Sequence, residues 1–237
     1  MDYQSVFKRY ELKYLLTHQQ KEQVLQAIEP YMELDEYGRT TIRNIYYDTE
    51  NYRLIRRSLE APIYKEKLRV RSYSQAKEDS KVFVELKKKY DSVVYKRRIS
   101  MPEQEAMLWL NQRKPNEEVT QISREVDYFM EYYKELRPAV FLTYEREAYY
   151  TKEKSDFRVT FDDTILCREE AISLQEEVWG RRILPENLVL MEVKCSGGIP
   201  IWMTTVLTSA GIRKTSFSKY GEAYKRIIFP NIHNRNN

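Results

Sequence analysis

Charged residues alternate with apolar ones in one segment after another of this chain, and that period of two limits the folds available to it. In YKEKLRVRSY, residues 64–73, every second position is a cation: Lys65, Lys67, Arg69 and Arg71. Successive side chains of a β-strand point to opposite faces, so the four cations share one face and the apolar residues between them share the other. The charged row is either the wet side of an ordinary sheet or the lining of a site that needs positive charge.

The same pattern predicts eight strands with helices inserted between them. The strands cover residues 6–16, 41–49, 64–73, 81–89, 93–100, 139–150, 157–163 and 188–196. Thr17 opens a helix with Gln20 as its capping-box partner, and Pro30 ends it. Further helices are expected at 102–111, 119–136, 201–209 and about 216–228. We expect one domain over residues 1–230, followed by a polar tail at 231–237.

The composition excludes several classes of protein. With 42% hydrophobic and 32% charged residues, the chain fits a soluble globular protein rather than a disordered or membrane one. The net charge of +4 is too small for a domain that wraps nucleic acid through its overall field. Cys167 and Cys195 form neither a disulfide framework nor a metal-ligand pair. Since no signal peptide or membrane-length apolar run is present, we expect a cytoplasmic protein with reduced thiols.

Alternating charge on most of the predicted strands has two interpretations. The simpler is an antiparallel sheet with one face in water, which is the common arrangement. A sheet of eight strands, however, tends to curl or close, and the helices need the apolar faces of the strands to pack on. We therefore expect an α+β fold, an eight-stranded antiparallel closed β-barrel with helices packed outside and the charged faces inside.

Such an interior holds more cations than carboxylates. The cations are Lys13, Lys67, Arg69, Arg71, Lys87, Lys96, Arg98, Arg146, Arg158 and Lys194, against Glu11, Glu85, Asp162 and Glu192. Because buried unpaired charge is costly, this surplus is reasonable only if a polyanion enters. Carboxylates suit Mg²⁺ or Mn²⁺, which bridge phosphate oxygens. The residues indicate phosphoryl transfer, in which positioning and charge neutralisation do most of the catalysis.

Two positions stay open at this point. Asp162 either helps to bind a metal or forms an ion pair with Arg158. Lys65 lies at the strand edge, where we expect it near the mouth of the barrel. The aromatic residues mostly alternate to the apolar faces, which argues against an external nucleic-acid platform.

In their order and spacing, these motifs resemble the triphosphate tunnel metalloenzymes (CYTH-like superfamily), and most of all the VTC (vacuolar transporter chaperone) domain of polyphosphate polymerase type. The resemblance extends through RYELKY, IYYDT, KLRVRSY, FVELKKK, YKRRIS, YEREAY, FRVTFDD, LMEVK and SFSKYGEAY. It implies a tunnel that binds a nucleoside triphosphate or polyphosphate, with ATP as the phosphate donor and Mn²⁺ or Mg²⁺ as the cofactor.

Together with the strand faces, the resemblance implies a role for each polar position. The expected catalytic residues are Arg69, Arg71, Lys87, Arg146 and Lys194. The expected phosphate-binding residues are Lys13, Lys67, Lys96, Arg98, Tyr144, Arg158, Ser218 and Lys219. The metal is expected on Glu192, with Glu85, Glu11 and Asp162 as further candidates.

The first strand departs from the superfamily pattern E-x-E-x-K, because Arg9 replaces the first acid. This departure favours a polymerase that transfers the γ-phosphate of ATP onto a growing polyphosphate chain. The alternatives are a tripolyphosphatase or nucleoside triphosphatase, with water as the attacking group, and a polyphosphate-binding module without catalysis. Expected partners are ATP or another triphosphate, polyphosphate and pyrophosphate, with no nucleic acid and no membrane segment. The sequence does not indicate an oligomeric state.

Overall fold

The computed structural model describes residues 10–91, 93–116, 119–153 and 155–235, so Arg9 lies outside the described part. Eleven strands form within it, and all eight predicted strands are among them. The strands are β1 (Tyr10–Thr17), β2 (Met32–Leu34), β3 (Thr40–Asp48), β4 (Tyr64–Ser72), β5 (Lys81–Tyr90), β6 (Val93–Pro102), β7 (Arg137–Thr151), β8 (Arg158–Arg168), β9 (Arg181–Arg182), β10 (Leu188–Cys195) and β11 (Lys214–Thr215).

The helices follow the predicted positions, with one addition. They are α1 (His18–Ile28), α2 (Arg53–Leu59), α3 (Glu103–Gln112), α4 (Gln121–Tyr133), α5 (Ile201–Ser209), α6 (Lys219–Ala223), a π-helical turn (Tyr224–Ile228) and α7 (Phe229–Arg235). The sequence did not predict α2, and α7 includes residues that were expected in the polar tail. No helix in the described ranges is long and apolar enough to cross a membrane.

Antiparallel pairing joins the strands in the order β11-β1-β10-β8-β7-β3-β4-β5-β6, with β2 added to β7 and β9 to β8. The α+β class and the antiparallel pairing are thus confirmed. The order has two ends, since no pairing between β6 and β11 occurs among the described residues. Hydrogen bonds therefore do not close the sheet, and the closed barrel is not confirmed.

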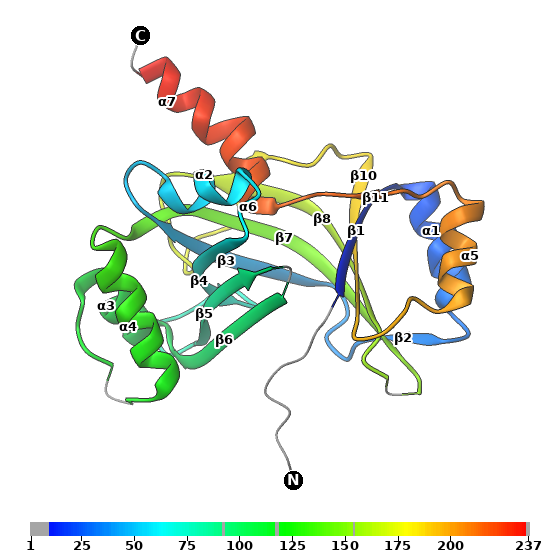
Figure 1. Cartoon of the computed structure of the whole chain (residues 1–237), viewed down its shortest axis with the longest axis horizontal. Coiled ribbons are helices and arrows are strands. Elements are labelled where there is room, and N and C mark those ends of the chain that lie inside the picture. The colour runs from blue at the N-terminus through cyan, green and yellow to red at the C-terminus, as the bar shows by residue number, and fades with distance from the viewer. Residues whose placement is uncertain (1–9, 92, 117–118, 154, 236–237) are drawn as a thin grey trace. The chain divides into compact units, whose positions relative to one another are not determined.

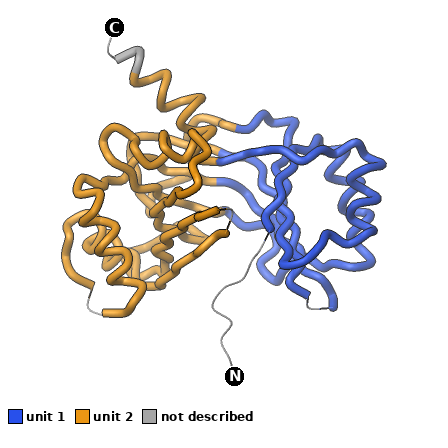
Figure 2. Tube along the Cα trace, in the orientation of Figure 1, with its two compact units in different colours: residues 1–41, 144–165, 184–218 blue, residues 42–143, 166–183, 219–237 orange. Residues whose placement is uncertain are grey.

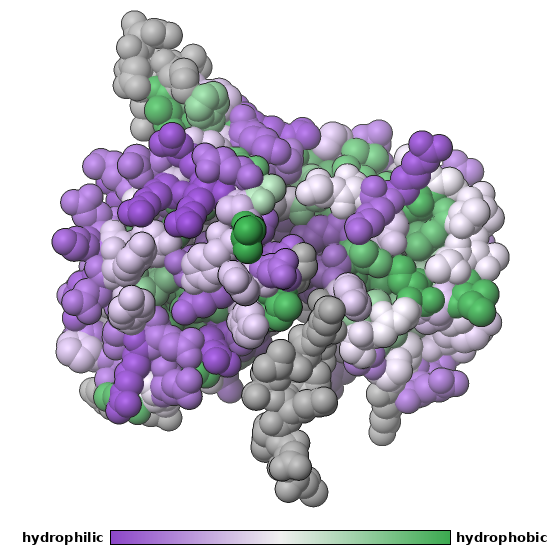
Figure 3. Space-filling view, viewed as in Figure 1, coloured by the Kyte–Doolittle hydropathy of each residue, from purple (hydrophilic) through white to green (hydrophobic). Residues whose placement is uncertain are grey.

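The chain divides into two compact units, each built from three separate segments (Figure 2). Unit 1 comprises residues 1–41, 144–165 and 184–218. In it, α1 and α5 lie side by side (Figure 1) and pack on the apolar faces of β1, β8 and β10. Val24 of α1 and Met203 of α5 are fully buried there. Apolar side chains also reach the surface over α5 (Figure 3), where Ile201 is exposed.

Unit 2 comprises residues 42–143, 166–183 and 219–237. Its core joins the apolar faces of β3, β4 and β5 to α3 and α4. Leu68 and Val70 of β4 are completely buried in this core, as is Trp109 of α3. In both units, then, the helices pack on the apolar faces of the strands, which leaves the charged faces on the other side.

The start of α1 is fixed by the capping box that the sequence predicts. Gln20 donates its backbone N–H to Thr17 Oγ1 at 3.2 Å, and the Thr17 N–H donates to Gln20 Oε1 at 2.9 Å. These two bonds satisfy amide groups that a helix end otherwise leaves without a partner.

We predict that Thr17→Ala lowers the free energy of unfolding by about 1 kcal/mol, because it removes the acceptor at the N-cap. Urea denaturation measures this change. Thr204→Ala is the control, since that exposed hydroxyl bonds only to Ile201 O within α5. An equal loss in both variants would show that the cap does not stabilise the helix.

Candidate functional site

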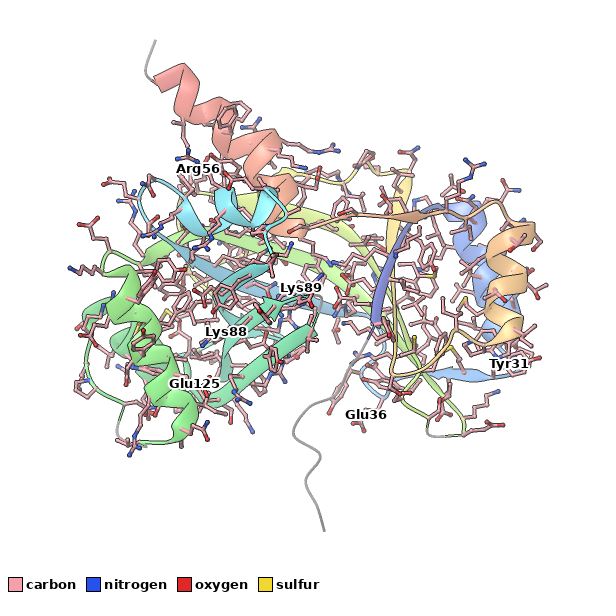
Figure 4. All side chains as sticks on the ribbon, viewed as in Figure 1. Tyr31, Glu36, Arg56, Lys88, Lys89 and Glu125 are labelled. Atoms are coloured by element: carbon pink, nitrogen blue, oxygen red, sulfur yellow. The ribbon has the colours of Figure 1, made fainter. Side chains whose placement is uncertain are left out.

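One face of β4, β5 and β6 in unit 2 carries an array of cations, which we call the unit 2 face. Directly paired residues of neighbouring strands share a face, and the register sets Lys65 opposite Lys89, Lys67 opposite Lys87, Lys87 opposite Lys96, Arg69 opposite Glu85, and Glu85 opposite Arg98. Like charges directly opposite each other destabilise a sheet. The four cations of YKEKLRVRSY thus belong to a wider surface that needs compensating charge. Figure 4 labels Lys89 and its neighbour Lys88 on β5.

Glu85 is the acidic centre of the unit 2 face, and its side chain is only 1% exposed. Arg69 Nη2 lies 2.7 Å from Oε2, while Lys96 Nζ and Arg98 Nη2 lie 2.7 and 2.6 Å from Oε1. Burial raises the pKa of Glu85, but the charges of Arg69, Arg71 and Lys96 outweigh it and hold the pKa well below its ordinary value. The Glu85 carboxylate therefore stays ionised, and cations lie beside both of its oxygens.

Lys96 responds to the same surroundings in the opposite sense. Its side chain is 43% exposed, but partial loss of solvent beside the sheet still lowers the pKa of Lys96 to about 8, although the Glu85 carboxylate opposes that change. Its charge is therefore sensitive to pH just above neutrality, unlike that of the arginines beside it.

Neighbouring polar and aromatic groups orient the arginines of the unit 2 face. Arg71 donates its Nε–H to Asn44 Oδ1 at 3.0 Å, and Arg69 donates from Nη1 to Tyr46 Oη at 3.0 Å. Arg98 donates from Nη2 to Tyr73 Oη at 2.7 Å. Burial raises the pKa of Tyr73, but the bond from Arg98 and the charge of Arg71 outweigh it, so the pKa is lowered. The guanidinium groups are thus fixed before any ligand arrives.

A second charged face lies in unit 1, on β1, β10, β8 and β7, and we call it the unit 1 face. The register sets Glu11 opposite Lys194, Lys194 opposite Arg158, Lys13 opposite Glu192, and Glu192 opposite Thr160. Arg146 of β7 forms a two-bond fork with Asp162 of β8, Nε–Oδ1 2.6 Å and Nη2–Oδ2 2.7 Å. Burial lowers the pKa of Arg146, but Asp162 and Tyr144 outweigh it and raise the pKa well above its ordinary value. This arginine is permanently charged.

Glu192 has looser ion pairs than Glu85 has. Its carboxylate lies 3.4 Å from Lys13 Nζ and 3.5 Å from both Arg146 Nη2 and Lys194 Nζ. Opposite it, the fully buried Thr160 Oγ1 has no hydrogen-bond partner. Across the described part of the chain, no three His, Cys, Asp or Glu side chains gather as a metal-binding group. A metal at Glu192 would therefore take most of its ligands from water and phosphate, which is usual for Mg²⁺.

The predicted site residues fall into two sets. Unit 2 holds Lys67, Arg69, Arg71, Glu85, Lys87, Lys96, Arg98 and Lys219, and unit 1 holds Glu11, Lys13, Tyr144, Arg146, Arg158, Asp162, Glu192, Lys194 and Ser218. The sequence left Asp162 open between a metal ligand and an ion-pair partner of Arg158. In the structure, both of its carboxylate oxygens accept hydrogen bonds from Arg146. Arg158 lies over the ring of Tyr150, 4.6 Å from its centroid. Lys13 also donates to Phe217 O at 2.9 Å.

The sequence analysis missed several residues of these faces. Lys89 continues the alternation of Glu85 and Lys87 and was detectable from it. Asn44 and Tyr46 were not, because only the pairing of β3 with β4 sets them beside Arg71 and Arg69. Thr160 lies on the predicted charged face of β8, but its hydroxyl carries no charge to draw attention to it.

A family model described as "VTC domain" matches residues 8–228. Among solved structures, a candidate adenylate cyclase from Bacillus halodurans is similar, with a TM-score of 0.55 and 14% identity, over 90% of this chain and 94% of that one. A candidate adenylyl cyclase from Hippeastrum, described as having a dominant triphosphatase activity, gives a TM-score of 0.51 and 15% identity, over 91% of this chain and 94% of that one. At these identities the likeness shows a shared fold. A search of curated proteins finds no match.

We predict that Glu85→Gln lowers the free energy of unfolding by about 3–5 kcal/mol at pH 7, because it leaves clustered cations without their buried anion. Urea denaturation of the variant and of the parent measures the loss.

The loss should also depend on pH. The folded pKa of Glu85 lies below its ordinary value of 4.5, so its contribution is complete above about pH 5 and fades as the pH falls. The difference between variant and parent should therefore shrink in acid, and a constant difference from pH 7 to pH 3 would contradict the ion-pair assignment. Glu50→Gln, at an exposed pair with Arg137, is the control and should cost less than about 1 kcal/mol.

Proposed function

The chain belongs to the VTC domain family, and from that premise we propose that it is a metal-dependent polyphosphate polymerase using ATP. The observation that carries the proposal is the charge of the unit 2 face. Nine charged residues of β4, β5 and β6 define this face, and Glu85 is the one acid among them. The other eight are Lys65, Lys67, Arg69, Arg71, Lys87, Lys89, Lys96 and Arg98. Such a surplus favours a ligand with several negative charges in a row. Oriented arginines and mobile lysine ammonium groups are the usual partners of phosphate.

In this proposal, Arg69, Arg71 and Arg98 bind phosphate oxygens in planes set by Tyr46, Asn44 and Tyr73. Glu85 acts as their organiser rather than as a metal ligand, because its oxygens already lie 2.6–2.7 Å from cations. Lys67, Lys87 and Lys96 add charge along the same face. Fixed cations cost little reorganisation when charge shifts in the transition state.

The residues of the unit 1 face fit a divalent metal. Glu192 would hold it together with Glu11, and the buried hydroxyl of Thr160 supplies another hard oxygen opposite Glu192. When bound, the ion would offset the negative charge of the phosphate groups. Asp162 keeps the Arg146 guanidinium in place, and Lys13, Arg158 and Lys194 supply further charge. Closure of the strands into the tunnel that the resemblance implies stays a prediction.

The proposed reaction exchanges one phosphoanhydride bond for another. A terminal oxygen of the growing chain attacks the γ-phosphorus of ATP and forms the new P–O bond. The bond from that phosphorus to the bridging oxygen of the β-phosphate breaks, and ADP leaves with the electron pair. The cations offset the charge on the transferred group and on the leaving oxygen, so no protein nucleophile is required.

Hydrolysis is the second candidate function, in which water attacks the same phosphorus. The triphosphatase activity described for the Hippeastrum structural neighbour favours it. The two reactions require the same cations and the same metal, so their products must separate them.

The test is to incubate the purified protein with ATP and Mn²⁺ or Mg²⁺ and to resolve the products on a gel. A ladder of long phosphate chains supports the polymerase, and release of orthophosphate alone supports the hydrolase. ATP binding without turnover would exclude both and leave a binding module. Glu192→Gln should abolish turnover in a protein that is less stable than the parent but still unfolds in one cooperative thermal transition. Glu147→Gln, which loses only a pair with Lys21, should stay active.

We further predict that ATP affinity falls with pH through the range set by Lys96. With a pKa of about 8, this ammonium group is mostly neutral at pH 9, so the affinity should drop about tenfold between pH 7 and pH 9. Bound phosphate raises the pKa in the complex, so protons are taken up on binding. Isothermal titration in buffers of different ionisation enthalpy measures both effects.

Lys96→Arg keeps the positive charge at all these pH values and should remove most of that dependence. Lys88→Arg is the matched control on the neighbouring strand and should retain it. Identical pH profiles for the parent and Lys96→Arg would contradict the assignment of Lys96 to phosphate.

A further inference from the structure

The polar face of β3 continues beyond the residues that orient the arginines. After Asn44 and Tyr46, the next residue on that face is Asp48, which is completely buried. Its Oδ1 accepts from the N–H groups of Thr49 and Leu54, both at 2.8 Å. Its Oδ2 accepts from the N–H of Ile55 and from the hydroxyl of Tyr220, both at 3.0 Å. One carboxylate thus joins the end of β3 to the first turn of α2 and to α6.

Tyr220 links this buried carboxylate to the cations. Its side chain is 2% exposed, and its ring stacks on Tyr46 with the centroids 4.9 Å apart and the planes 27° from parallel. Burial and the nearby Asp48 raise the pKa of Tyr220 well above its ordinary value, so the phenol keeps its proton and donates. Tyr46 in turn accepts from Arg69, which donates from Nε to Glu85 Oε2 at 2.7 Å.

We propose that Asp48 and Tyr220 are positioning residues for phosphate binding: their hydrogen bond fixes the ring that supports Tyr46, and Tyr46 fixes the guanidinium of Arg69. The inference rests on the proposed function for the nature of the ligand. It adds two residues to the phosphate-binding groups assigned above. The same bond anchors the backbone of α6 next to Lys219, the residue before Tyr220.

The contribution of this chain of contacts can be bounded. A net hydrogen bond changes an equilibrium by about two- to thirteenfold, and one to a charged group changes it by more. Tyr220→Phe keeps the stacked ring and removes only the hydroxyl, so the ring loses its fixed tilt while the core stays filled. We expect the dissociation constant for sodium tripolyphosphate to rise about fivefold in this variant, within that range.

A control separates positioning from general stability. Tyr47 follows Tyr46 in β3, and its buried hydroxyl donates to Asn111 Oδ1 at 2.7 Å. Tyr47→Phe removes that hydroxyl, but the Tyr47 ring packs in the core and not on the charged face. Both variants should lower the melting temperature, and only Tyr220→Phe should weaken tripolyphosphate binding. Equal binding by Tyr220→Phe and the parent would overturn the inference.

Tyr46→Phe tests the intermediate step. It should weaken tripolyphosphate binding by itself, and adding Tyr220→Phe should then have little further effect, because both act through Arg69. Independent effects that multiply would overturn the proposed route.

A ligand-free measurement keeps this inference distinct from the proposed function. The Arg69 Nε–H resonance, assigned in the ¹⁵N NMR spectrum by its loss in Arg69→Lys, should shift in Tyr220→Phe and stay unchanged in Tyr47→Phe. An unshifted resonance in Tyr220→Phe would overturn the positioning role whatever the protein binds. A parent protein that binds neither tripolyphosphate nor ATP would instead contradict the proposed function.

Discussion

The arrangement of unit 2 depends on one buried carboxylate that holds several cations at the same time. Arg69, Lys96 and Arg98 come from strands on either side of Glu85, and each lies within 2.7 Å of it. Without that carboxylate, Arg69 and Arg98 would lie on either side of a position that carries no compensating charge. The polar face therefore cannot be understood as a wet sheet surface. Glu85 is the acid that Arg69, Lys96 and Arg98 share on this face.

Much of the fold could be predicted from the sequence, because alternation with a period of two marks most of the long strands, and β-branched and aromatic residues mark residues 41–49. The sequence did not predict α2, because RLIRRSL is short and rich in arginine. In addition, Tyr52 before it adopts a left-handed φ of 57° that no local sequence signal indicates. The sequence predicted which candidate site residues share a face of a strand, but not which side chains bond to each other. Pairing Arg146 with Asp162, or Tyr46 with Arg69, requires the strand register, which tertiary structure sets.

The family match and the structural likenesses agree on the fold but leave the reaction to the side chains. The resemblance to the VTC domain is confirmed by the family match, while likeness to cyclase candidates at 14–15% identity carries no residue roles. The two acidic centres then differ in a way that sequence could not show. Cations lie 2.6–2.7 Å from both oxygens of Glu85, whereas Lys13, Arg146 and Lys194 lie 3.4–3.5 Å from the carboxylate of Glu192.

The facing lysines on β4, β5 and β6 have a consequence for the life of the protein in a cell. Lys65 lies opposite Lys89, and Lys67 opposite Lys87, so an anion bound over these rows reduces the repulsion between paired ammonium groups. Any polyanion that fills these rows binds the folded chain and not the unfolded one, so it stabilises the fold by mass action. On the proposed function, substrate supply and resistance to proteolysis are linked, because the protein with bound substrate unfolds less often.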